Sequence, residues 1–536
     1  MKAEKGRSRD RQKGGQARDA DPPPPGHASW WERLDRWRWL PVALAAAALA
    51  MAALFFDANL DLSGDNAEFI ILGRSLAAGQ GLTYTQGPVP EPAVKFPFGF
   101  PLLLAATQLL FPNNLIAPKI LVVLLFGLAM PLLYRLLRRV GSVPMAMAVC
   151  LCSLLSPPLL DYSHQVMSEI PYLVASLLGL LLLTRAVEAK GPGALAAALL
   201  AVMGAYYIRT AGVALVAAAV GVLLLRRSYR EAGIAAGAVV LMALPWQLRN
   251  ASIQGGNSYV RQLLSVNPYD PSLGPLTPAA LLARVLTNAE LYGGAIVPRL
   301  FIPTLSSSGA ALATAWVLGI VLAGLLLAGV ASDVRRRDPL AVYLALYLVV
   351  CLLWPQVWTD VRFLVPVIPL LFRAVFTGVL LAARRLAQWS SALPARRIAS
   401  ALLAVVVVAN LAGDRALAEQ LGQYPPNWRS FLLAAEWIRQ NTDPSTVVAS
   451  RKVYQMHLVS QRKSVGYRFG PPAEVIAGLE ADGAGVVVVD QLGFLSTPRY
   501  LVPAIQAHRE RFEILRTVPA PDTYILRFVP QAAPTP

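Results

Sequence analysis

The sequence predicts a polytopic α-helical membrane protein of about eleven transmembrane helices, with a C-terminal α/β domain outside the membrane. Of its 536 residues, 56% are hydrophobic and only 15% are charged, and the mean hydropathy is +0.51. A soluble domain cannot bury that much apolar surface. The apolar residues form runs of membrane-spanning length separated by short charged breaks, which is the pattern of a multi-pass helical protein.

The first 29 residues are polar, carry mixed charge and end in the proline run 22–25, so we expect a disordered cytoplasmic tail. This tail lacks the apolar core of a signal peptide. Trp and Arg alternate over residues 30–39, which is typical of a helix in the membrane interface. The transmembrane domain is expected to occupy residues 30–414.

Arginine positions predict how the apolar runs cross the membrane. Basic clusters follow every second run, and the positive-inside rule places these clusters and the tail in the cytoplasm. About eleven spans then leave the C-terminal region outside. The run 97–111 is short, so we expect a re-entrant or interfacial helix there. The predicted spans are the runs 40–56, 116–134, 144–160, 170–184, 193–207, 212–225, 232–246, 311–331, 340–356, 363–382 and 398–413.

The net charge of +17 does not indicate nucleic-acid binding, because the basic residues lie in the tail and in short loops rather than on one face. The three cysteines, Cys150, Cys152 and Cys351, lie in apolar runs and imply no disulfide framework.

Residues 415–530 have an ordinary globular composition. Residues 427–441 have helical spacing of apolar positions, and three β-branched runs follow between Gly, Pro and Asp. This alternation predicts a small extracytoplasmic α/β domain. Residues 531–536 are expected to be a disordered tail.

The topology leaves only arginine-rich turns on the inner side and places the acidic and exceptional basic residues on the outer side, beginning with the outer loops 57–115 and 247–308. Asp65 and Glu68 lie three residues apart on a predicted helix and therefore share a face, and Lys95 follows in the same loop. A carboxylate there could deprotonate a hydroxyl or bind a divalent cation, or simply cap the helix. Lys95 could hold a lipid phosphate or only extend to water.

A second set of ionisable groups lies at the outer ends of later spans. Glu169 begins an apolar run, and a carboxylate there is unfavourable unless it is wetted or paired. Arg209, Arg249 and Arg362 depart from the positive-inside rule, and guanidinium groups bind phosphate or carboxylate bidentately. Each arginine alone fits an interfacial position, but together they favour a site for an anionic headgroup. His164 belongs to no metal-binding motif and is expected to be a lone surface histidine.

The order of these segments resembles the GT-C class of membrane glycosyltransferases that use polyprenyl-phosphate sugars. This class includes the protein O-mannosyltransferases and the lipid A aminoarabinose transferase. The resemblance spans nearly the whole chain, and the bacterial members have a similar outer domain. The matching segments are GDNAEFIILGRSL, KFPFGFPLLL, SHQVMSEIPY, YYIRTAG, PWQLRN and VRFLVPVIPLL.

The resemblance implies that Asp65 is the catalytic or acceptor-orienting carboxylate and that Lys95 holds the donor phosphate, together with Arg209, Arg249 or Arg362. Some members carry a second acid directly after the first. Asn66 occupies that position here, so Glu68 or Glu169 is the substitute.

Val94 stands where some members bind a metal through Glu. No cofactor is therefore assigned, and a divalent cation is left open.

The implied function is inverting transfer of a sugar from a polyprenyl-phosphate donor to a glycan, lipid or protein acceptor of the envelope. The implied location is the outer face of a bacterial inner membrane. The alternatives are a lipid-linked sugar flippase or other transporter, and a non-catalytic assembly or polymerase-like protein. A carrier should show midplane charges and duplicated halves, and the sequence shows neither.

Overall fold

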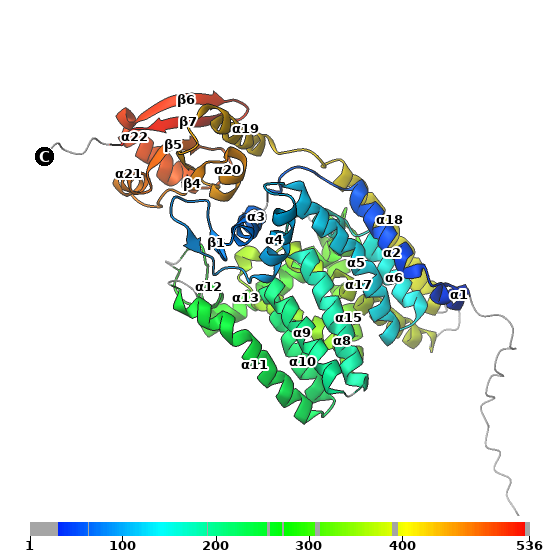
Figure 1. Cartoon of the computed structure of the whole chain (residues 1–536). Coiled ribbons are helices and arrows are strands. Elements are labelled where there is room, and N and C mark those ends of the chain that lie inside the picture. The colour runs from blue at the N-terminus through cyan, green and yellow to red at the C-terminus, as the bar shows by residue number, and fades with distance from the viewer. Residues whose placement is uncertain are drawn as a thin grey trace, which may run out of the picture.

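The computed structural model describes residues 30–530 except 63, 190, 254–257, 271–272, 306–310 and 389–394. The expected tails 1–29 and 531–536 lie outside the described residues. Figure 1 shows a long helical bundle with a small unit of strands and helices at one end. At the other end, α1 (Trp30–Arg36) meets α2 (Leu40–Leu54) at an angle of 86°.

The multi-pass helical fold is confirmed. Among the described residues, six helices are long and apolar enough to cross a membrane, and the bent pair α1–α2 would make seven. Five shorter apolar helices accompany them, so the number of about eleven spans stays a prediction. The six long helices are α5 (Ile116–Val140), α8 (Glu169–Ala189), α11 (Tyr229–Ser252), α15 (Ala311–Arg335), α17 (Ile368–Ala387) and α18 (Ala395–Ala418). The five shorter ones are α4 (Gly99–Leu110), α6 (Val143–Leu154), α9 (Pro192–Ile208), α10 (Val213–Leu225) and α16 (Pro339–Leu353).

Helix α4 corresponds to the apolar run that we expected not to cross the membrane. It has 12 residues, and at 1.5 Å per residue its length is about 18 Å, against a hydrocarbon core of about 30 Å. It packs on α3 (Gly64–Ala77) and on α5, and Figure 1 shows it between these two helices. Its length agrees with a re-entrant or interfacial helix.

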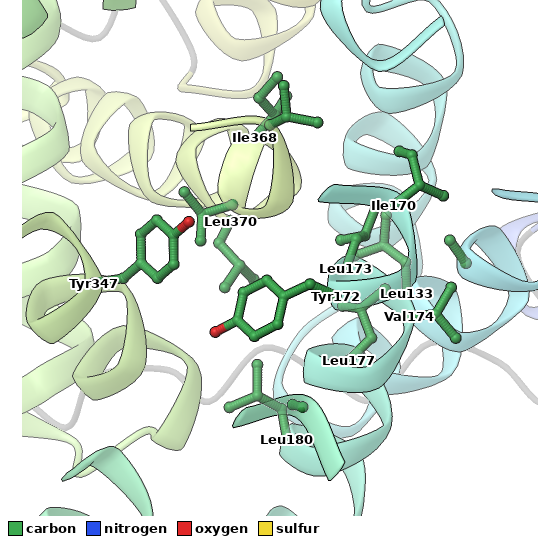
Figure 2. Packing of buried hydrophobic residues seen from close by; sticks show 14 of the residues in the cluster. Leu133, Ile170, Tyr172, Leu173, Val174, Leu177, Leu180, Tyr347, Ile368 and Leu370 are labelled. Carbon is green, nitrogen blue, oxygen red and sulfur yellow. The ribbon is translucent and has the colours of Figure 1, made fainter. Parts of the chain in front are cut away.

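A buried aromatic layer joins α8, α16 and α17. Tyr172 and Tyr343 share a hydrogen bond of 3.0 Å, and the Tyr347 hydroxyl donates to the carbonyl of Phe363 at 2.8 Å. Figure 2 shows Tyr172 and Tyr347 in this layer with branched aliphatic side chains around them. Because the hydroxyls are satisfied, the layer is stable without water. It fixes the first turn of α8 against the segment that precedes α17.

Glycines allow α15 and α17 to approach closely. A Cβ on Gly329 would collide with the carbonyl of Ala374, and a Cβ on Gly378 would collide with the carbonyl of Leu325. Backbone atoms cannot rotate away as a side chain does, so both positions require glycine. Small residues serve membrane helix packing in this way, since close approach adds van der Waals contact where lipid gives no hydrophobic drive.

The C-terminal unit is a five-stranded sheet with helices. The strand order is β4-β3-β5-β7-β6, in which β4, β3 and β5 are parallel and β7 and β6 are antiparallel. Alternate valines of β5 enter separate apolar clusters on the two faces of the sheet, as a period of two requires. The strands are β3 (Val447–Ala449), β4 (Lys463–Val465), β5 (Ala484–Val489), β6 (Phe512–Val518) and β7 (Thr523–Phe528). The main helices are α19 (Pro426–Asn441), α20 (Val453–Ser460), α21 (Pro472–Ala481) and α22 (Val502–Ala507).

Helix α18 extends to Ala418, four residues past the boundary at residue 414 that composition indicates. The charged residues Asp414 and Arg415 suggest an end of the apolar run, but the helical backbone continues through them.

The C-terminal unit packs on the loop between α3 and α4. This loop contains a short hairpin of β1 (Thr83–Tyr84) and β2 (Glu91–Pro92). The amide of Ser464 donates to the carbonyl of Gln86 at 2.7 Å, and Lys463 Nζ donates to the carbonyl of Thr85 at 2.8 Å. The hairpin therefore lies between the helical bundle and the sheet, beside α3.

Candidate active site

Helix α3 presents two carboxylates on one face. Asp65 lies in its first turn and Glu68 one turn later, so both point toward the loop that follows. Negative charge is favourable near a helix N-terminus, where backbone amides lack partners. Gly79 and Gly81 follow the helix with φ of +73° each, which is the left-handed region that favours glycine and lets the chain turn back.

Lys95 returns from the hairpin to meet both carboxylates. Its Nζ donates to Asp65 Oδ1 at 2.8 Å and to Glu68 Oε1 at 2.9 Å. The Tyr84 hydroxyl donates to the other oxygen of Glu68 at 2.8 Å. The loop therefore closes on α3 through one ammonium group and one phenol.

Arg362 extends this cluster to the start of α8. Its Nη2 lies 2.6 Å from Asp65 Oδ2, and its Nε lies 2.5 Å from Glu169 Oε1. Arg209 Nη1 donates to the same Glu169 oxygen at 2.6 Å and to Ser168 Oγ at 2.8 Å. Carboxylates and cations thus alternate across the site, in an ionic network made of Glu68, Lys95, Asp65, Arg362, Glu169 and Arg209.

The network is most exposed at Lys95 and most buried at Glu169, and Glu68 beside Lys95 is also buried. The Glu169 side chain is 0% exposed and that of Arg209 is 8% exposed, whereas the Lys95 side chain is 40% exposed. Arg362 and Asp65 lie between these limits at 20% and 18%. Lys95 and Arg362 are therefore the more accessible cations of the network, and Arg209 is the most buried one.

The charges of the network set the proton affinities of its outer groups. Burial alone would raise the pKa of Asp65, but the charges of Arg362 and Lys95 outweigh it and hold that pKa well below the usual value. At Glu68 burial dominates and raises the pKa, although Lys95 opposes it. Burial disfavours the charged form of Lys95, yet Glu68 and Asp65 overcome this and raise its pKa. Asp65 is therefore a held anion, and Glu68 is the more basic carboxylate.

Six of the seven residues that the sequence indicates meet in this network, and Arg249 lies apart from it. Arg249 Nη1 donates to the carbonyl of Ala93 at 2.9 Å, and its guanidinium lies 5.1 Å from the ring centroid of Trp246. It therefore binds the backbone two residues before Lys95. In this structure Arg249 supports the loop and makes no ion pair among the described residues.

A neighbouring buried cluster was not predicted from the sequence. Lys119, 2% exposed, donates to Asp61 Oδ1 at 2.6 Å, and Asn66 Nδ2 and the amide of Val166 donate to Asp61 Oδ2 at 2.6 and 3.1 Å. This cluster ties α3 to α5 and to the segment before α8. The available signal was a lysine placed inside an apolar run, which requires a buried partner.

His164 is not at the surface, contrary to our expectation. Its side chain is 3% exposed, its ring centroid lies 5.9 Å from that of Phe56, and burial lowers its pKa to about 4. The buried ring is neutral at ordinary pH. Within the described ranges, no group of three or more His, Cys, Asp or Glu side chains is arranged to hold a metal ion.

Comparisons with known proteins agree with this architecture. The family model described as dolichyl-phosphate-mannose-protein mannosyltransferase matches residues 95–246, a segment that includes Lys95, Glu169 and Arg209. A search of curated protein sequences found no match.

Three solved structures are similar over most of the chain. ArnT from Cupriavidus metallidurans in the apo state has a TM-score of 0.53 at 14% identity, over 92% of this chain and 99% of that one. The same protein bound to undecaprenyl phosphate has a TM-score of 0.52, with equal identity and coverage. The Archaeoglobus fulgidus oligosaccharyltransferase, in complex with zinc and sulfate, has a TM-score of 0.53 at 14% identity, over 84% of this chain and 67% of that one.

The chain is therefore a multi-pass membrane protein with the fold of the GT-C glycosyltransferases, as the order of its motifs indicates. Such low identity shows the fold and leaves the chemistry to be argued from the site.

Proposed function

We propose that this protein is an inverting glycosyltransferase that moves a sugar from a polyprenyl-phosphate donor to a glycan, lipid or protein acceptor of the envelope. The observation that carries the proposal is that Asp65 is held by two partly exposed cations of the ionic network, Lys95 and Arg362. Two cations that converge on one carboxylate are also placed to converge on one phosphate, which offers the same kind of oxygen acceptors.

In the donor complex, Lys95 and Arg362 bind the donor phosphate, and their ion pairs with Asp65 are lost or weakened. Its pKa then rises from its depressed value toward the ordinary range, because those two charges are what lower it. Asp65 becomes able to accept a proton, or to align the acceptor hydroxyl, only when the donor is bound.

The transfer is a single displacement. The acceptor oxygen forms a bond to the anomeric carbon from the side opposite the phosphate, and the bond between that carbon and the phosphate oxygen breaks. The phosphate keeps the bonding electron pair, and Asp65 takes the acceptor proton, so the anomeric configuration inverts. The leaving phosphate gains negative charge, which Lys95 and Arg362 stabilise through charge-assisted hydrogen bonds.

The remaining residues position this pair of cations. Glu169 and Arg209 are buried and hold Arg362 from behind. Glu68 holds Lys95 and is the alternative proton acceptor, since its pKa is raised. Arg249 supports the backbone that carries Lys95. No step needs a metal ion, because the two cations supply the positive charge.

The donor, the acceptor and the side of the membrane are parts of the proposal. A similar structure holds undecaprenyl phosphate, which supports a polyprenyl-phosphate donor. The positive-inside rule supports an outer site, in a bacterial inner membrane with the N-terminus in the cytoplasm. The outer loop 247–308 and the C-terminal unit are the proposed surfaces for the acceptor.

The test begins with a deletion strain whose envelope glycans, lipids and glycoproteins are compared with wild type by mass spectrometry. We expect one sugar to be missing from one acceptor class. Purified protein should then restore that sugar on envelope material from the deletion strain, given a radiolabelled polyprenyl-phosphate sugar and no ion gradient. A flippase would make no new glycoside in this assay, so labelled lipid without labelled product would contradict the proposal.

A further inference from the structure

A basic pocket lies where the α1–α2 elbow meets α5 and α8. Its volume is about 420 Å³, and five arginines contribute to its lining. They come from three separate segments of the chain, which converge at one level of the bundle. The arginines are Arg38, Arg135, Arg138, Arg139 and Arg185.

This pocket lies at the opposite end of the bundle from the ionic network. Lys119, near the start of α5, bonds Asp61 beside the network, and Arg138 lies in the last turn of the same helix. Nineteen residues separate them in the sequence, which in a helix is about 28 Å, close to the thickness of a hydrocarbon core. The two sites therefore face opposite leaflets.

The pocket holds more positive charge than its own carboxylates neutralise. Asp35 accepts two bonds from Arg138, at 3.0 and 2.8 Å, and a third from Tyr134 at 2.6 Å, so this pair is saturated. Arg139 pairs with Glu188, which lies outside the lining. Arg38, Arg135 and Arg185 line the pocket and are exposed. None of the three makes an ion pair with a residue in the described part of the chain.

The pocket also has an apolar wall and an interfacial rim. Leu40, Pro41 and Leu181 line it beside the arginines, and Trp37 borders it with 48% of its surface exposed. Exposed Trp next to Arg is typical of the headgroup level of a bilayer. A free phosphate ion has no apolar part that could contact this wall. A phospholipid presents its phosphate and the start of its acyl chains together, so it can contact the arginines and the wall at once.

We propose that this pocket binds the headgroup phosphate of an anionic phospholipid in the leaflet opposite the ionic network. Arg135 and Arg185 hold the phosphate, and the Asp35–Arg138 pair keeps the elbow in position to receive it. Basic pockets between membrane helices on the cytoplasmic side bind anionic headgroups in this manner. The bound lipid would fasten α1 to α5 and α8. This site is separate from the proposed donor site.

The test is native mass spectrometry of the full-length protein titrated with phosphatidylglycerol or phosphatidylcholine. We expect selective binding of phosphatidylglycerol, weakened about tenfold or more in Arg135→Gln/Arg185→Gln. The matched control is Arg336→Gln/Arg230→Gln, which removes two exposed arginines from the same end of the bundle and should leave binding within about twofold. Equal binding by the pocket variant and wild type would overturn the proposal.

Two further measurements are needed. The first distinguishes a lipid phosphate from free inorganic phosphate, and the second tests the wild-type protein, so that a misfolded variant cannot explain the result. Millimolar inorganic phosphate should not displace the lipid, and displacement would overturn the lipid assignment in favour of a free anion. Hydrogen exchange of the wild-type protein in nanodiscs should show protection of residues 36–41 when phosphatidylglycerol replaces phosphatidylcholine. This measurement needs no variant, and unchanged exchange there would contradict the proposal.

Discussion

At the scale of single residues, the network is a set of exchangeable ion pairs. Asp65 is bonded to Lys95 at 2.8 Å and to Arg362 at 2.6 Å, and each cation keeps a second carboxylate, Glu68 or Glu169. If a phosphate displaces Asp65, neither cation leaves its other partner. The site can therefore bind a donor without rebuilding its buried end.

Lys95→Ala and Arg362→Ala should each reduce transfer about 100- to 1,000-fold, since each removes one cation from the charge that develops on the leaving phosphate. Steady-state assays at varied donor concentration would measure the loss in kcat/KM. The matched control, Arg439→Gln, removes a surface arginine paired with Glu436 and should leave activity unchanged. Activity within about threefold of wild type in Lys95→Ala would rule out its proposed role.

The depressed pKa of Asp65 predicts a pH dependence of stability. A carboxylate whose folded pKa lies below the unfolded value stabilises the protein above the unfolded pKa, near 3.9, and loses this effect as pH falls toward the folded value. Asp65→Asn should therefore be less stable than wild type by about 1.5–3 kcal/mol near neutral pH. Thermal unfolding should show a constant difference from pH 8 to pH 5 that shrinks below about pH 4. A difference that disappears already at pH 6 would contradict the ion-pair account.

The sequence predicted the residues of this network better than their contacts. Six of the seven residues that the sequence indicates meet in the network. Some were indicated because a charge beside an apolar run requires a partner, and Arg209 and Arg362 because they depart from the positive-inside rule. The same rules could not tell that Arg249 bonds backbone carbonyls while Arg362 bonds two carboxylates. Lys119 was missed because its run is otherwise apolar, and its partner Asp61 lies 58 positions earlier in the chain.

At the scale of elements, the packing of α15 on α17 depends on glycine. Gly329→Val should place its side chain against the backbone of α17 and lower stability by about 1–3 kcal/mol or more. Gly324→Val is the matched control on the same helix, because a Cβ there meets nothing within 4 Å. Thermal unfolding in one detergent compares the two variants. Equal midpoints would show that the close approach of these helices is not required.

Element boundaries were predictable where local chemistry sets them. Glycines with left-handed φ follow α3 at Gly79 and Gly81, and α4 was expected to be too short to cross. Helix α13 (Pro278–Glu290) begins after a capping residue, since the Thr277 hydroxyl accepts from the amide of Ala280. The end of α18 was not predictable, because the helix continues through the buried Asp414 and the exposed Arg415 instead of ending at the first charge.

At the scale of the whole molecule, the arrangement predicts which parts face each side of the membrane. The three native cysteines are buried, so they give little background in thiol labelling. Ser445→Cys, on the exposed surface of the C-terminal unit, should react with a membrane-impermeant maleimide in intact spheroplasts. Arg336→Cys, in the turn after α15, should react only after the membrane is permeabilised. The reverse pattern would invert the proposed topology.

Contacts between distant parts of the chain were the least predictable feature. Composition separates the C-terminal residues from the bundle, but no local pattern indicates that Ser464 bonds Gln86 or that Tyr454 packs on Tyr84 with ring centroids 5.5 Å apart. These contacts place the sheet over the loop that carries Lys95. A site assembled from α3, that loop, α8 and the segment before α17 exists only in the folded bundle.

The most direct test of the central claim compares wild type with Asp65→Asn in the purified transfer reaction. Both proteins receive a radiolabelled polyprenyl-phosphate sugar and acceptor material from the deletion strain, and labelled glycoside is measured together with donor binding. We predict that wild type makes the glycoside, and that Asp65→Asn loses at least about 100-fold in rate while it still binds the donor through Lys95 and Arg362. Full activity in Asp65→Asn would contradict the mechanism, and no product from wild type would contradict the proposed function.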